Sequence, residues 1–63
     1  MYEVGQRVSD IERCPLAKII EKKDVNGVWW YRLREYAHPH AMWWTDEIHI
    51  GPPREIRHDA SIA

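Results

Sequence analysis

The stretch LAKIIEKKDVNGVWWYRLREY, residues 16–36, decides the fold. Its centre is Asn26-Gly27, the dipeptide that most readily adopts the positive φ angles of a tight hairpin turn. The residues on both sides of it include many β-branched and aromatic side chains, which favour strands. The stretch therefore predicts a β-hairpin that joins residues 16–23 to residues 28–36.

Successive side chains of a strand point to opposite faces, so the second strand of this hairpin divides into two sets. The more apolar set is predicted to face the core, together with isoleucines from elsewhere in the chain. The predicted core consists of Trp29, Tyr31, Leu33, Ile19 and Ile48. The opposite set is predicted to face outward and consists of Val28, Trp30, Arg32, Arg34 and Tyr36.

The remaining segments are short and are bounded by turn signals. The further elements that we predict are strands at residues 6–11 and 41–44 and a last apolar pair at Ile48 and Ile50. Cys14-Pro15 is expected to break the chain after the first strand, because Pro15 has no N–H to donate to a ladder. Residues 16–22 also tolerate a helix, but their two β-branched isoleucines favour a strand.

These elements define an all-β domain of four to five short antiparallel strands. In a chain of 63 residues, only a barrel gives every strand two neighbours. We therefore expect a small barrel over residues 1–51, which ends at Gly51-Pro52-Pro53. Residues 52–63 are expected to form a tail that is frayed or makes one short helical turn.

Composition excludes several classes of protein. Nine Lys and Arg against ten Asp and Glu give a formal charge of -1, which disfavours a general nucleic-acid binder. The single cysteine, Cys14, cannot form an internal disulfide. No apolar run approaches the roughly 18 residues of a membrane span, and no signal peptide is expected at the N-terminus. We expect a cytoplasmic protein without a membrane partner.

The order of these elements resembles the SH3-like barrel in its Tudor and KOW variety, as found in small bacterial and phage proteins. The segments that carry the resemblance lie between residues 4 and 51 and read VGQRV at 4–8, AKII at 17–20, WYRL at 30–33 and WTDEI at 44–48. The resemblance implies a small barrel of four to five strands that acts by binding other molecules. Its Tudor side implies a cage for a methylated cation, with Trp30, Tyr36, Trp43 or Trp44, and Asp46 or Glu47 as its parts.

A second resemblance is to the plasmid-borne type II dihydrofolate reductases, which are tetramers of SH3-like chains around one pore. The stretch YRLREYAHP at residues 31–39 is similar to a segment of that family, and GQRV at 5–8 is similar to its opening strand. Where the family has Val-Gln-Ile-Tyr, however, this chain has Met42-Trp43-Trp44-Thr45. The resemblance implies a homo-oligomer, and reductase activity on a pterin and a nicotinamide is an alternative function.

Adjacent tryptophans point to opposite faces of a strand, so one member of each Trp pair is expected to face outward. Exposed aromatic side chains beside arginine are typical of binding surfaces. We therefore predict a non-enzymatic module of bacterial or phage type that binds a protein partner. The predicted partner-binding residues are Trp30, Arg32, Arg34, Tyr36, Trp43 and Trp44.

Purely structural roles for these side chains, and other functions, are alternatives at this point. The tail could cover the outward indoles through Ile56 or Ile62, and the arginines could pair with Glu21 or Glu47. Nucleic-acid binding of the KOW kind is a further alternative, because Trp and Arg side chains also bind single strands.

The histidines and the cysteine predict no site for chemistry. His38 and His40 are expected in a solvated loop, although with His49 or His58 they could contribute to a zinc site. Cys14 has no recognisable catalytic partner. We expect no catalytic residue, no metal and no cofactor.

Overall fold

A computed structural model describes residues 1–54 and shows one antiparallel sheet of five strands in the order β4-β3-β2-β1-β5. The strands are β1 (Arg7–Asp10), β2 (Cys14–Val25), β3 (Val28–Glu35), β4 (Met42–Asp46) and β5 (Ile50–Gly51), with a 3-10 helix, η1 (Glu47–His49), before the last. The sheet is open, with β4 and β5 at its edges. The all-β prediction is therefore confirmed.

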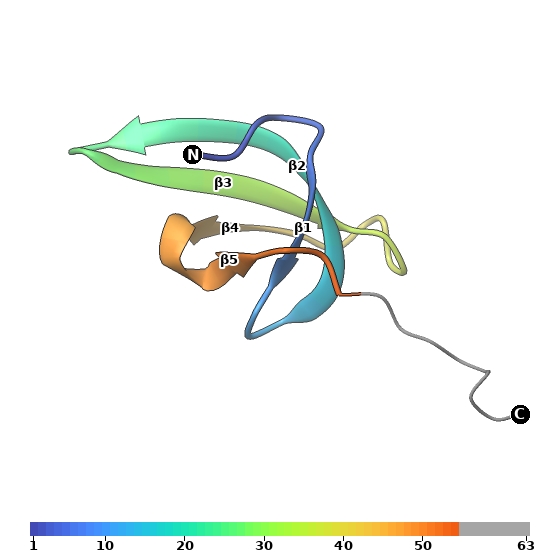
Figure 1. Cartoon of the computed structure of the whole chain (residues 1–63). Helices are drawn as coiled ribbons and strands as arrows, with labels where there is room; N and C mark the ends of the chain where they lie inside the picture. Colours follow the sequence, from blue (N-terminus) through green and yellow to red (C-terminus); the bar gives the residue numbers. More distant parts are fainter. Residues whose placement is uncertain (55–63) are drawn as a thin grey trace, which may run out of the picture.

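The central hairpin forms as the sequence predicts, and its turn lies at the projecting end of β2 and β3 in Figure 1. Val25 and Val28 are directly paired, and both turn residues have positive φ, 54° at Asn26 and 85° at Gly27. These angles match a turn whose twist agrees with the twist of the flanking strands. The Gly27 N–H also donates to Oδ1 of Asp24 at 2.8 Å.

The expected break at Cys14-Pro15 is wrong. The chain turns at residues 11–13 instead, and β2 begins at Cys14, opposite Asp10 of β1. Pro15 is tolerated because it lies at the start of the strand, where a missing donor costs little. Its carbonyl accepts a hydrogen bond of 2.9 Å from the Arg54 N–H, which places the end of the described chain beside β2.

The strand β2 is long enough to pair with two neighbouring strands. Its first part pairs with β1, while residues 17–25 pair with β3. The register with β3 shifts between Ile19 and Glu21, and an irregularity of this kind bends a strand and increases its twist. The seven apolar side chains buried by the sheet are Val8, Cys14, Ala17, Ile19, Tyr31, Leu33 and Ile50.

The predicted core is correct except at one position. Ile19, Tyr31 and Leu33 are fully buried, and Trp29 packs partly buried against them. The prediction for Ile48 is wrong, since 79% of its surface is exposed. It lies in the 3-10 helix η1, where side chains do not alternate between two faces as they do in a strand. The isoleucine that is buried instead is Ile50, in β5.

Tyr2 closes the core from the N-terminal side. Its ring meets Tyr31 edge to face at 5.6 Å, and its backbone N–H donates to the Tyr31 hydroxyl at 3.0 Å. The Tyr2 hydroxyl donates to the carbonyl of Ile50 at 3.1 Å. Both tyrosine hydroxyls thus find partners near the core, as buried polar groups require.

The predicted tail begins within the described chain, at Pro52 to Arg54, and neither proline belongs to a strand. Residues 55–63 of this predicted tail, which include Ile56, His58 and Ile62, lie outside the described residues. Within residues 1–54, the structure has no helix with the length and hydrophobicity needed to cross a membrane.

Candidate functional site

The pairing of β2, β3 and β4 brings most of the predicted site residues to one side of the sheet. Arg32 lies opposite Trp44, and Arg34 lies opposite Met42. Because side chains of directly paired residues share a face, all four point away from the buried Tyr31 and Leu33. We call this side the outer face and define it by Lys18, Glu21, Lys23, Trp30, Arg32, Arg34, Met42, Trp44 and Asp46.

The structure decides which member of each tryptophan pair faces outward. Trp30 and Trp44 belong to the outer face, whereas Trp29 and Trp43 pack against the core. The Trp43 Nε1–H donates to Oδ2 of the buried Asp10 at 2.7 Å, and the Arg13 guanidinium lies 4.5 Å from the centre of its ring. Trp43 is therefore a packing residue, and it does not contribute to the outer face.

The outer face is apolar at its β4 edge. Trp44 is 38% exposed and Met42 is 44% exposed, and the Nζ of Lys23 lies 4.4 Å above the Trp44 ring. This contact crosses β3, because Lys23 on β2 is paired with Trp30. The indole of Trp44 is thus held by a cation on one side while much of its surface remains accessible.

Positive charges outnumber negative charges on the outer face. Four cationic side chains lie among its nine residues, with two carboxylates, although the whole chain has a net charge of -1. Arg32 donates to Oε1 of Glu21 at 3.2 Å, which is one of the pairings that the sequence left open. Glu47 does not pair with the arginines and instead contacts the N-terminal amine at 3.2 Å.

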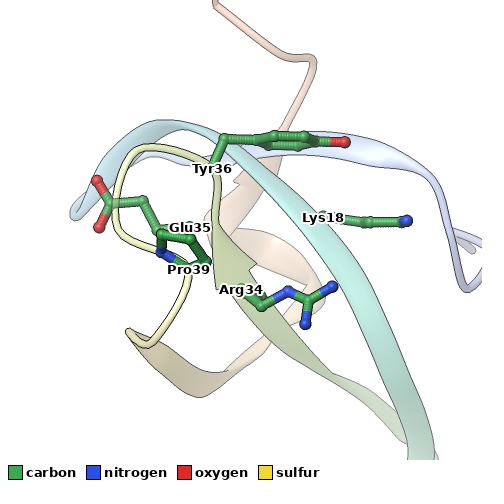
Figure 2. Close-up of a pocket in the computed structure, with 5 residues that line it drawn as sticks. All are labelled: Lys18, Arg34, Glu35, Tyr36 and Pro39. Carbon is green, nitrogen blue, oxygen red and sulfur yellow. The ribbon is translucent and has the colours of Figure 1, made fainter.

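A hollow of about 370 Å³ lies at the other end of the outer face, where β3 leads into the loop before β4. Its lining residues are Lys18, Arg34, Glu35, Tyr36 and Pro39. Figure 2 shows the Lys18 and Arg34 side chains extending in the same direction, with the Tyr36 ring above them, whereas the Glu35 carboxylate turns to the opposite side. Tyr36 is 44% exposed, so its ring forms an open wall of the hollow.

The side chain of His49, in η1, contacts the turn between β1 and β2. His49 Nδ1 is hydrogen-bonded to Oδ1 of Asp46, and its Nε2 lies 3.6 Å from Oε2 of Glu12. The hydrogen bond to Asp46 raises the pKa of His49, and the nearby carboxylate charges act in the same direction. Sequence analysis missed this contact, although the spacing of three residues between Asp46 and His49 was a visible signal.

The cysteine and the loop histidines of the described chain lie in different environments. Cys14 is buried, and the loss of solvation raises the pKa of its thiol, which disfavours the nucleophilic thiolate. His38 and His40 lie exposed in the loop between β3 and β4. In residues 1–54, no three His, Cys, Asp or Glu side chains are grouped so that they could hold a metal ion.

Of the six predicted partner-binding residues, all but Trp43 lie on the outer face or in the hollow beside it. Lys18, Lys23 and Met42 are additional members that sequence analysis did not assign. The chain matches no protein-family model, and no curated protein or solved structure shows significant similarity to it. Its function is therefore inferred from the outer face and the hollow.

Proposed function

We propose that this protein is a non-enzymatic binding module that engages an acidic segment of a protein partner through the outer face. The observation that carries the proposal is the placement of Trp44 and Met42, both accessible, directly opposite Arg32 and Arg34. Aromatic and arginine side chains are the groups that most often dominate the energy of protein interfaces. The excess of cations among these residues favours a partner segment that contains carboxylates.

We further propose that this open five-stranded sheet is a variant of the SH3-like class in which β4 and β5 do not close the barrel. Support comes from the long β2, which pairs with β1 through its first part and with β3 through the rest, and from the register shift between them. In such an arrangement a short, stiff sheet presents the outer face with little loss of conformational entropy on binding.

Binding of single-stranded nucleic acid is the second candidate. Trp30 and Trp44 could stack on bases, and the four cations of the outer face could contact phosphates. Two observations favour the protein partner. Glu21 pairs with Arg32, and Asp46 places another carboxylate opposite Trp30 on the same face. These carboxylates repel a backbone that carries a charge on every nucleotide more than a peptide segment whose carboxylates are separated by neutral residues. Reductase activity stays a prediction of the family resemblance, and NADPH oxidation with dihydrofolate tests it directly.

The decisive experiment is selection of peptides from a random displayed library against the full chain. We expect the enriched peptides to be acidic and to lose binding when Arg32→Ala and Trp44→Ala are combined. A matched control combines Arg54→Ala and Ile11→Ala, which remove an exposed arginine and an exposed apolar side chain that lie in none of the strands β2, β3 and β4. That control is expected to bind like the unmodified chain.

Two results would contradict the proposal. One is an enriched set of peptides that bind the Arg32/Trp44 variant unchanged. The other is an oligothymidine that binds the unmodified chain at physiological salt more tightly than any selected peptide, because this would favour the nucleic-acid alternative.

A further inference from the structure

Two cations lie directly opposite each other on the outer face. Lys18 of β2 is paired with Arg34 of β3 on one side and with Arg7 of β1 on the other, and like charges in such pairs destabilise a sheet. The neighbouring pair on the same face joins opposite charges, since Glu21 and Arg32 form an ion pair with an N···O distance of 3.2 Å. The ladder thus contains a complementary pair and, beside it, a pair whose charges repel.

Within the described chain, neither Lys18 nor Arg34 has a carboxylate within 4.0 Å. Other cations are engaged: Lys22 pairs with Glu3 at 3.2 Å, and Lys23 lies over Trp44. The nearest carboxylate in sequence, Glu35, points away from the two cations (Figure 2). No ion pair within residues 1–54 therefore offsets the repulsion between Lys18 and Arg34.

The space in front of these cations is suited to an anion. The hollow of about 370 Å³ is open to solvent, and Glu35, Tyr36 and Pro39 line the rest of it, with the Glu35 carboxylate turned to the opposite side (Figure 2). Arg34 offers a planar fork of N–H donors, Lys18 a point charge, and Tyr36 a hydroxyl. The three groups extend in the same direction in Figure 2. An oxyanion seated between them would receive hydrogen bonds from several donors at once.

We propose that this hollow is a binding site for a phosphate monoester. A monoester has a charge of about -1.5 to -2 at neutral pH and so neutralises both cations, whereas a carboxylate or an internal phosphodiester neutralises only one. The monoester belongs either to a small molecule or to a phosphorylated side chain of the protein partner. Only the second source rests on the function proposed above.

The test is a titration followed by NMR of the ¹⁵N-labelled full chain with inorganic phosphate. We expect saturable shifts at Lys18, Arg34 and Tyr36, and a loss of affinity of about ten-fold or more in Arg34→Gln. The matched control is Arg13→Gln, which removes an arginine that lies over Trp43 and does not line the hollow, and it is expected to bind phosphate normally. Affinity for inorganic phosphate is expected to fall as the pH is lowered through about 7, where this ion loses its second charge, about one pH unit above a monoester.

A stability measurement gives a second, independent result. Because the paired cations repel, Lys18→Gln and Arg34→Gln are expected to raise the melting temperature without phosphate, whereas Arg32→Gln lowers it. Phosphate is then expected to raise the melting temperature of the unmodified chain and not that of the Lys18 or Arg34 variants. These measurements contain no peptide, so they can succeed or fail separately from the proposed protein partner.

Two further ligands distinguish the source of the phosphate. A phosphoserine peptide that binds much more tightly than inorganic phosphate and also shifts Trp44 indicates a phosphorylated partner, whereas equal affinities indicate a small molecule. The proposal is overturned if phosphate shifts Lys and Arg signals uniformly over the molecule. It is also overturned if acetate or dimethyl phosphate binds as tightly as phosphate, or if Lys18→Gln and Arg34→Gln leave phosphate binding unchanged.

Discussion

The two neighbouring tryptophans of β4 allow a stringent test, because the same substitution should have different costs at adjacent positions. Trp43→Phe removes the Nε1–H that donates to Oδ2 of Asp10 at 2.7 Å. Asp10 is only 2% exposed, and its other oxygen already accepts from the Glu12 N–H at 2.9 Å. A hydrogen bond to a buried charged group contributes about 1.5–3 kcal/mol.

The smaller ring also loses contact with the core and with Arg13, which adds roughly 1 kcal/mol. The expected cost of Trp43→Phe is therefore about 2–4 kcal/mol. A domain of 63 residues has a total free energy of unfolding of only about 3–9 kcal/mol, so this variant loses a large part of its stability.

Trp44→Phe is the matched control. The Trp44 side chain lies on the outer face, is 38% exposed, and forms no hydrogen bond with any residue of the described chain. Its replacement loses only part of the contact with Lys23 and should cost no more than about 1 kcal/mol. Urea unfolding followed by far-ultraviolet circular dichroism measures both variants without relying on indole fluorescence. Equal costs, or a larger cost at Trp44, would refute the assignment of Trp43 to the core side.

Two further predictions concern the pH dependence of stability and the hairpin turn. Because contact with Asp46 and Glu12 raises the pKa of His49, its contribution to stability is present below about pH 6.5 and is lost as the pH rises through the raised value. Urea midpoints near pH 6 and above pH 8 should therefore differ more in the unmodified chain than in His49→Gln, and identical differences would argue against this contact. Gly27→Ala should cost about 1–2 kcal/mol because φ is 85°, although a Cβ there would meet nothing within 4 Å. Gly51→Ala places its Cβ at ordinary contact distances from the side chains of Ser9 and Ile11 and should cost much less, so equal thermal melts would contradict this explanation.

The central hairpin could be predicted from sequence because its determinants are local. Asn26-Gly27 specifies the turn, and the turn specifies the register of Val25 with Val28. Alternation along β3 then assigns Tyr31 and Leu33 to one face and Arg32 to the other without any knowledge of distant contacts.

The arrangement of β4 could not be predicted in the same way. Its sequence contains two adjacent tryptophans. Whichever of them faces inward, one indole lies on each face of the sheet, so the alternation of apolar residues does not distinguish the two arrangements. The choice depends on the pairing of Arg32 with Trp44, which is set by the loop between β3 and β4 and by burial of the Trp43 indole against Asp10. The error at Ile48 has a related cause, since η1 interrupts the period of two on which the prediction relied.

An all-β chain built around one hairpin, with many indole rings and no basic excess, follows from the amino-acid sequence alone. Those properties depend on local turn chemistry and composition. Only the tertiary structure decided that Trp44 lies outward while Trp43 packs inward, and that Lys18 faces Arg34 beside an open hollow. The reason is that register between strands is a property of pairs of segments, and the bulge in β2 shifts it by an amount that neither strand shows alone.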